Sequence, residues 1–144
     1  MQVHQILRAK PKTDIITVAP GTSVADAARL LAERRIGAVV VSEDGKVPLG
    51  ILSERDIVRD LGRRGSGCLT DTVDSLMTRN LISCGPKDVA DSVLEKMTTG
   101  RFRHMPVMEE GKMVGIISIG DVVAARISEL AMEKDALEGM IMGN

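Results

Sequence analysis

The sequence is poor in aromatic residues, with one phenylalanine and no tyrosine or tryptophan among 144 residues. A hydrophobic core must therefore be aliphatic, with nine methionines available to fill gaps. The same scarcity argues against base-stacking platforms for nucleic acid. The net charge is only -1, so no global field attracts nucleic acid or an anionic membrane. We expect neither of them as a partner.

Cysteine, histidine and long apolar runs are also scarce. The two cysteines, Cys68 and Cys84, form no disulfide framework or metal signature, so we expect free thiols and no metal site. No apolar run approaches the roughly 18 residues of a membrane span, and the N-terminus has no signal-peptide segment. A cytoplasmic protein is the expectation.

Recognisable catalytic machinery is missing as well. The sequence has no G-x-x-x-x-G-K-[ST] phosphate loop. Neither Ser53 nor Ser118 has a histidine at a spacing that suggests an activated nucleophile. We therefore expect no enzymatic activity, no catalytic residue and no catalytic cofactor.

What the sequence does contain is an internal repeat. The heptapeptide GILSERD at 50–56 returns as GIISIGD at 115–121, an offset of 65, and Pro20 returns as Pro86, an offset of 66. After each proline, apolar residues recur at i, i+3, i+4 and i+7, which predicts an amphipathic helix. The two sets are Val24, Ala27, Ala28 and Leu31, and Ala90, Val93, Leu94 and Met97.

Strand patterns surround each predicted helix in the same order. A short strand precedes the helix, and an acidic-Gly turn joins two strands of a hairpin after it. A further helix begins at each Ser-x-x-Asp, and similar lead-ins, VHQIL and VDSLM, precede the two halves. The predicted strands are 14–19, 36–41 and 49–53 in the first half, and 80–84, 104–108 and 113–118 in the second.

The repeat divides the chain into segments. We expect an α/β fold of two β-α-β-β-α repeats related by a pseudo-twofold, with sheets packed together and helices outside. A Gly-rich stretch separates the repeats, and a helical tail ends the chain. The expected segments are a first repeat 1–64, a linker 65–72, a second repeat 73–130 and a tail 131–144.

The repeat resembles a tandem pair of CBS domains, often called a Bateman module. The resemblance covers about residues 1–130 and is most specific in the two G-h-h-S-x-x-D motifs, each placed after a helix and a hairpin. The chain looks like the free-standing bacterial form. The resemblance implies a regulatory module that binds adenosine-containing ligands, which across the family include AMP, ADP, ATP, NAD and S-adenosylmethionine.

The resemblance also implies two ligand clefts between the repeats, each taking its Ser-x-x-Asp from the opposite repeat. The first cleft would use Ile16, Ile36, Gly37 and Ala38 together with Ser118 and Asp121. The second would use Ile82, Phe102, Arg103 and His104 together with Ser53, Arg55 and Asp56. The clefts differ in charge, so they would differ in preferred ligand, and one of them could be empty.

Several of these residues also have a structural interpretation. A carboxylate at a helix start can accept hydrogen bonds from both ribose hydroxyls, but Ser-x-x-Asp is also a helix capping box. The two roles of the motif are compatible. Arg103 and Arg55 could receive phosphates or be solvated surface charges, and His104 could be structural. Ile16 and Ile82 could be plain core residues, and Gly37 could serve packing alone.

The tail suggests a protein partner. Apolar residues recur at helical spacing from Val123 through Ile127 and Leu130 to Leu137 and Ile141. An exposed stripe there would suit a homodimer, whereas the alternative is a tail that packs back on its own domain. A second function stays open beside ligand sensing, namely a ligand-independent dimeric scaffold or interaction module for an unidentified regulated protein.

Overall fold

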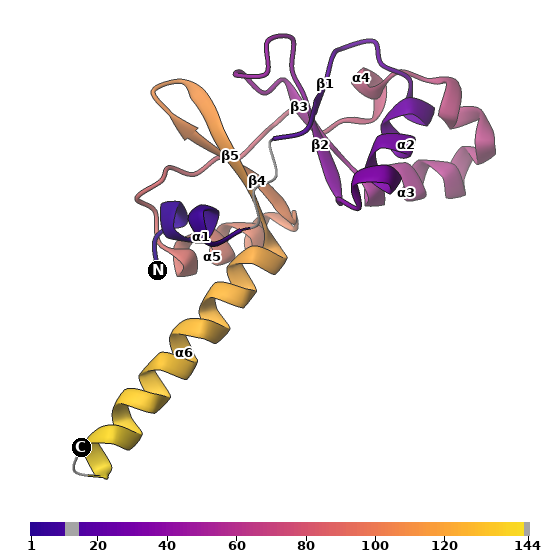
Figure 1. The fold of residues 1–144 in the computed structure, drawn as a ribbon. Helices are drawn as coiled ribbons and strands as arrows, with labels where there is room; N and C mark the ends of the chain where they lie inside the picture. Colours follow the sequence, from indigo (N-terminus) through magenta and orange to yellow (C-terminus); the bar gives the residue numbers. More distant parts are fainter. Residues whose placement is uncertain (11–14, 143–144) are drawn as a thin grey trace. The chain divides into compact units, whose positions relative to one another are not determined.

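The computed structural model describes residues 1–10 and 15–142, and it confirms the predicted mixed α/β class (Figure 1). The chain forms two compact units, each with its own hydrophobic core. The units do not follow the chain order, because unit 1 combines the N-terminal segment with most of the second half. Unit 1 comprises Met1–Lys12, Ser83–Glu109 and Gly115–Asn144, and unit 2 comprises Thr13–Ile82 and Glu110–Val114.

The sheet of unit 2 has three strands in the order β1 (Thr17–Val18), β2 (Ala38–Val41) and β3 (Gly50–Ser53). β1 runs parallel to β2, and β2 runs antiparallel to β3, which confirms the predicted hairpin. Every residue of β2 is buried, as its continuous apolar sequence predicts. β1 is shorter than the predicted strand 14–19, whose first residue, Asp14, lies outside the described residues.

Two helices of unit 2 begin and end where local chemistry requires. α2 (Val24–Arg34) starts after Ser23, whose side chain accepts a hydrogen bond from the N–H of Asp26. It ends at Arg35 in a left-handed conformation with φ of 53°. α3 (Glu54–Arg64) follows β3 directly. The helices and strands enclose an aliphatic core of Val24, Ala27, Leu31, Val39, Val41, Leu52, Ile57 and Val73.

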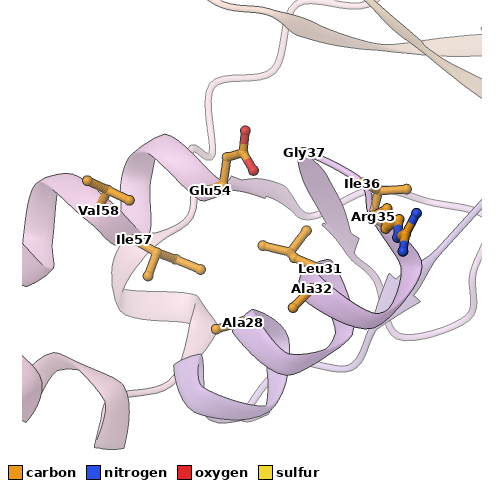
Figure 2. Close-up of a pocket in the computed structure, with 9 residues that line it drawn as sticks. All are labelled: Ala28, Leu31, Ala32, Arg35, Ile36, Gly37, Glu54, Ile57 and Val58. Atoms are coloured by element: carbon orange, nitrogen blue, oxygen red, sulfur yellow. The ribbon is translucent and has the colours of Figure 1, made fainter.

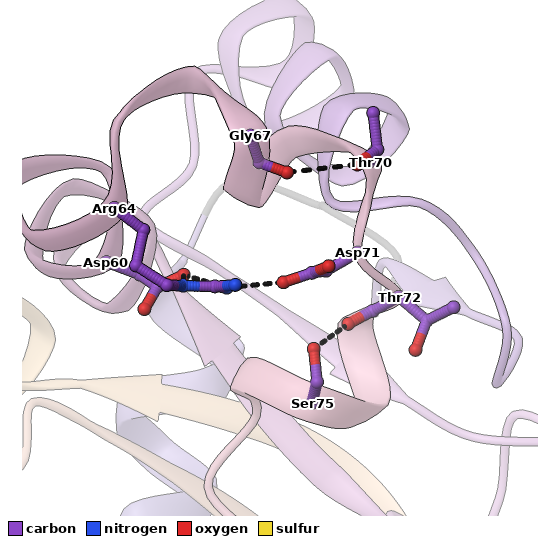
Figure 3. Close-up of polar contacts among 7 residues, drawn as sticks. All are labelled: Asp60, Arg64, Gly67, Thr70, Asp71, Thr72 and Ser75. Atoms are coloured by element: carbon purple, nitrogen blue, oxygen red, sulfur yellow. Dashed lines mark hydrogen bonds and ion pairs between the residues drawn. The ribbon is translucent and has the colours of Figure 1, made fainter.

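The predicted linker folds as part of unit 2. It contains a 3-10 helix, η1 (Gly65–Thr70), and the short helix α4 (Val73–Leu76) follows it. The Arg64 guanidinium joins the end of α3 to this segment through ion pairs with Asp60 and Asp71 (Figure 3). Cys68 in η1 is fully buried, so this stretch is packed structure rather than a solvated connection.

In its described residues, unit 1 repeats the helices and the hairpin of unit 2, but it has no counterpart of the strand β1 or of the 3-10 helix η1. It contains α1 (Val3–Ala9), α5 (Ala90–Gly100), β4 (His104–Glu109) and α6 (Ile119–Ile141), together with β5 (Lys112–Ser118) from Gly115 onward. The predicted hairpin is present, because β4 and β5 pair. The predicted strand 80–84 is wrong, since only an isolated parallel bridge between Cys84 and Val107 remains.

Two prolines explain this difference. In unit 2, the N–H of Val40 donates to the carbonyl of Ile16. The position that matches Val40 at an offset of 66 is Pro106, which has no N–H to donate. On the other side of the Cys84–Val107 bridge, continuation of the parallel ladder would require an N–H donor at residue 86. That residue is Pro86, which also lacks an N–H. The ladder is therefore limited to the bonds that surround Cys84.

The glycine that opens each heptapeptide accommodates a lead-in helix. A Cβ at Gly50 would lie 2.5 Å from the Sδ atom of Met77, just after α4. A Cβ at Gly115 would lie 2.8 Å from the Cδ1 atom of Leu7 in α1. The first lead-in thus packs on the heptapeptide of the second repeat, within unit 1. The second lead-in packs on the heptapeptide of the first repeat, within unit 2.

α6 confirms the long C-terminal helix. Its first turns pack against α5 through the buried Val122 and Ala125, whereas its C-terminal half extends away from α1 and α5 (Figure 1). No helix in the described part of the chain combines the length and the apolar character needed to cross a membrane.

Candidate functional site: two capped helix starts

In unit 2, the Ser-x-x-Asp motif forms a complete capping box where β3 turns into α3. The Ser53 Oγ accepts a hydrogen bond from the N–H of Asp56 at 3.2 Å. The Asp56 Oδ2 accepts hydrogen bonds from the N–H and the hydroxyl of Ser53, both at 2.9 Å. The capping interpretation of the motif is therefore confirmed. It holds a part-buried carboxylate at the helix start, with Asp56 18% exposed.

Unit 1 builds the same box where β5 turns into α6. The Asp121 Oδ2 accepts from the N–H of Ser118 at 2.9 Å, and the Ser118 Oγ accepts from the N–H of Asp121 at 3.1 Å. The Asp121 side chain is 21% exposed. The repeat at an offset of 65 thus reproduces a three-dimensional feature as well as a sequence pattern.

A backbone hydrogen bond connects each helix start to the residue that directly precedes the first strand of the hairpin. The N–H of Glu54 donates to the carbonyl of Gly37 at 2.9 Å in unit 2, and the N–H of Ile119 donates to the carbonyl of Arg103 at 2.8 Å in unit 1. In addition, Ala38 pairs directly with Ser53. Each capped carboxylate therefore lies beside the predicted base-contacting strand of its own repeat.

The predicted site residues divide between the two units. The structure brings Ile36, Gly37 and Ala38 near the box of Ser53, Arg55 and Asp56, and it brings Arg103 near the box of Ser118 and Asp121. The prediction that each ligand meets residues of both repeats stays a prediction. Unit 2 contains Ile16, Ile36, Gly37, Ala38, Ser53, Arg55, Asp56 and Ile82, and unit 1 contains Phe102, Arg103, His104, Ser118 and Asp121.

Burial separates the core-like candidates from the accessible ones. Ile16, Ile36 and Phe102 pack against the cores of their units, which for Ile16 supports the interpretation as a plain core residue. By contrast, the side chains of Arg55 and Arg103 are exposed, and so is Ile82. The cysteines Cys68 and Cys84 are free and buried, and burial raises the pKa of the Cys84 thiol to about 11.

A pocket of about 520 Å³ lies between α2 and α3 in unit 2 (Figure 2). Its size is typical of small-molecule sites. Its lining includes two predicted residues, Ile36 and Gly37, and also Arg35 and Glu54, which place one positive and one negative group at an otherwise apolar surface. The Asp56 carboxylate is absent from this lining. The remaining lining residues are Ala28, Leu31, Ala32, Ile57 and Val58.

The structure adds one residue that the sequence did not indicate. The Nζ atom of Lys10 lies 2.8 Å from the Oδ2 atom of Asp121 and donates to the carbonyl of Ile116 at 3.1 Å. A separation of more than 100 residues hides this pair from any local pattern. The only available signal was that a lysine follows the first lead-in whereas Asn80 follows the second.

The Lys10 ammonium changes the acidity of the carboxylate beside it. Burial acts to raise the pKa of Asp121, but the hydrogen bond from Lys10 and that from the Ser118 N–H outweigh burial. The pKa of Asp121 therefore lies below the ordinary value for aspartate, and the carboxylate stays charged at neutral pH.

The chain is similar to known proteins over most of its length. The CBS domain family matches residues 3–63 and 73–128. A CBS-domain protein of Agrobacterium tumefaciens, ATU1752, has 44% sequence identity and a TM-score of 0.82, over 88% of this chain and 99% of that chain. The protein CBSCBSPB2 of Arabidopsis thaliana is 35% identical over 86% of this chain, which spans only 23% of the plant protein.

A further solved structure contains ligands. The CBS domain pair of the protein MJ0100, in complex with 5'-methylthioadenosine and S-adenosyl-L-methionine, has 25% sequence identity to this chain. Its TM-score is 0.76, over 90% of this chain and 98% of that one. The two ligands named for that protein both contain an adenosine group.

The Lys10–Asp121 pair makes a prediction about acid stability. The pKa of Asp121 is lower in the folded state than in the unfolded chain, so the charged carboxylate stabilises the fold. This contribution to the free energy of unfolding is complete above about pH 4, the ordinary aspartate pKa, and is lost as the pH falls through the pKa of the folded state. We expect Asp121→Asn to cost about 1–2 kcal/mol at pH 7 and to lose less stability on acidification than the wild type. Urea unfolding between pH 7 and pH 3 measures both effects.

Asp135→Asn is the matched control, because it removes one carboxylate from the exposed C-terminal half of α6. This variant should follow the wild-type pH dependence. Parallel pH dependences for Asp121→Asn and the wild type would show that the ion pair contributes nothing to acid sensitivity.

Proposed function

The chain belongs to the CBS-domain family, as a tandem pair of CBS domains, and we propose that it is a regulatory module that binds adenosine-containing ligands. The observation that carries the proposal is the capped carboxylate built twice, at Asp56 and at Asp121. A cytoplasmic location, a non-enzymatic role and an unidentified regulated protein belong to the same proposal.

The chemistry of the capped carboxylates suits a ribose. In each box the Oδ2 atom of the aspartate accepts the capping hydrogen bonds. The Oδ1 atom of Asp56 lies 3.6 Å from the Arg59 guanidinium, and Lys10 and the N–H of Ser118 contact Asp121 at its Oδ2 atom. A part-buried oxygen of this kind can accept a charge-assisted hydrogen bond from a ribose hydroxyl.

The ligands proposed are AMP, ADP, ATP, NAD or S-adenosylmethionine. Support for the adenosine class comes from the two ligands of the MJ0100 domain pair. A ligand that binds one conformation more tightly than another shifts the population toward it, and a partner protein that senses the same conformation is coupled by an equal free energy. Regulation by this route requires no chemistry on the ligand.

A homodimer through α6 is the second part of the proposal. The apolar stripe is exposed along the helix, and its members are spaced by four, three, seven and four residues, as in a heptad pattern with Lys134 at the skipped position. Two such stripes pack against each other in a coiled coil. The stripe consists of Val123, Ile127, Leu130, Leu137 and Ile141.

Ligand binding is tested by thermal unfolding followed by titration. Millimolar AMP, ATP, NAD or S-adenosylmethionine should raise the melting temperature, because a ligand of the native state stabilises it. Asp56→Ala and Asp121→Ala should each weaken binding at their own site by about 10- to 150-fold, the equivalent of one charged hydrogen bond. Calorimetric titration with AMP and with NAD measures this loss.

Asp56→Asn and Asp121→Asn separate binding from folding, because asparagine keeps a side-chain oxygen for the capping bond. Asp135→Ala is the matched control and should bind as the wild type does. The absence of any melting shift with all four ligands would favour the ligand-independent scaffold instead. Unchanged affinity in both Asp→Ala variants would remove these carboxylates from the site.

Self-association is tested by multi-angle light scattering. The wild type should have the mass of a dimer at micromolar concentration. Leu137→Glu should yield a monomer, because it places a charge within the stripe, where the side chain is 60% exposed. Met132→Glu is the control, since Met132 is 62% exposed but lies off the stripe. A monomeric wild type, or equal effects of the two substitutions, would contradict the dimer.

A further inference from the structure

The two capped carboxylates differ in their counter-ions. The Asp121 carboxylate has the Lys10 ammonium at 2.8 Å, and the lysine side chain is only 26% exposed. The Asp56 carboxylate has the Arg59 guanidinium at 3.6 Å, and this side chain is 61% exposed. The electrostatic neutralisation is therefore tighter at Asp121 than at Asp56, because solvent screens the second pair more strongly.

This difference originates in the lead-in segments. Val3 of the first lead-in corresponds to Val73 of the second at an offset of 70, and Lys10 then corresponds to Asn80. An asparagine amide carries no charge, so the second lead-in provides no equivalent ammonium. The two segments also differ in charge at other positions, such as Arg8 against Thr78 and Ala9 against Arg79, but Lys10 is the residue that forms the ion pair with Asp121.

Lys10 contacts the same oxygen of the Asp121 carboxylate as the capping hydrogen bond does. Its ammonium and the N–H of Ser118 both contact Oδ2 of Asp121. Within residues 1–10 and 15–142, the hydrogen bonds of the carboxylate are formed by Oδ2 rather than by Oδ1. A ribose hydroxyl at Oδ1 therefore need not displace Lys10, and the ammonium would lie within a few ångströms of the bound sugar.

The neighbouring residues also favour an anion at Asp121. The helix start carries Ile119 and Gly120, whereas the matching positions of α3 carry Glu54 and Arg55. Arg103, whose carbonyl binds the start of α6, has an exposed side chain, and its counterpart in unit 2 is an uncharged glycine. The Asp121 box thus has the Lys10 ammonium beside its carboxylate, without the second acidic residue that Glu54 adds at the start of α3.

We propose that Lys10 determines the ligand specificity of the Asp121 site by charge, favouring a phosphorylated nucleoside over an uncharged or cationic one. This inference rests on the proposed function, because it requires that Asp121 binds the ribose. The ammonium attracts a phosphate attached to the bound sugar and repels the sulfonium of S-adenosylmethionine. At the Asp56 site this selection is weaker, because the Arg59 guanidinium is more distant and more exposed to solvent.

The test uses the full chain carrying Asp56→Asn, so that binding reports on the Asp121 site. Calorimetric titrations with adenosine, AMP and S-adenosylmethionine are compared in this background with and without Lys10→Met. We expect Lys10→Met to weaken AMP binding about 10-fold and to change adenosine binding less than 2-fold, because only AMP carries the attracted charge. The preference for AMP over S-adenosylmethionine should fall accordingly.

Two further variants separate charge from structure. Lys10→Arg keeps the positive charge and should keep the preference for AMP. Lys87→Met removes an exposed lysine elsewhere in unit 1 and should leave all three affinities unchanged. Circular dichroism of each variant establishes that it is folded before the affinities are compared.

Each contrary result has a distinct meaning. Equal losses for adenosine and AMP in Lys10→Met would overturn the inference, because Lys10 would then act only on the shape of the site. Tighter AMP binding in that variant would also overturn it, because Lys10 would then compete with the ligand. Binding to the wild type but not to the Asp56→Asn background would overturn the inference alone. A wild type that binds none of the three ligands would overturn the proposed function together with it.

Discussion

The reciprocal hydrogen bonds between a serine and the aspartate three residues later fix the point where strand becomes helix in both repeats. The carboxylate caps the serine N–H while the hydroxyl caps the aspartate N–H, so the aspartate is held at the helix start in a defined orientation. One of its oxygens is committed to the fold. The proposed function depends on the other oxygen, which the same bonds hold in place for a ligand.

Around this shared constraint, the two repeats have diverged in ways that change chemistry. Pro106 of the second repeat occupies the position that matches Val40 of the first, and it lacks the N–H donor that would extend the sheet of unit 1. Lys10 of the first lead-in occupies the position that matches Asn80 of the second, and it provides an ammonium at Asp121. Both substitutions leave the capped helix start intact. The fold thus tolerates differences between the repeats that give the two carboxylates different electrostatic surroundings.

The sequence predicted those features that depend on local patterns. The helices after Pro20 and Pro86, the two hairpins and the capping boxes follow from periodicity and turn chemistry, and all are present. The strand predicted at 80–84 did not form beyond the bridge at Cys84. One of the two prolines that limit its pairing, Pro106, lies in the neighbouring strand β4, so the pattern of 80–84 by itself does not reveal the missing donor. The Lys10–Asp121 pair could not be predicted, because the fold brings together residues distant in the chain and no period marks them.

In the proposed function, the capped carboxylates bind the ribose hydroxyls of an adenosine ligand. The most direct test compares AMP with 2',3'-dideoxy-AMP in calorimetric titrations of the wild-type protein, because the two ligands differ only in the hydroxyls concerned. We predict binding of AMP and at least roughly 10-fold weaker binding of the dideoxy analogue, since the carboxylate would lose its hydrogen-bond donors. Equal affinities for the two ligands would contradict the claim.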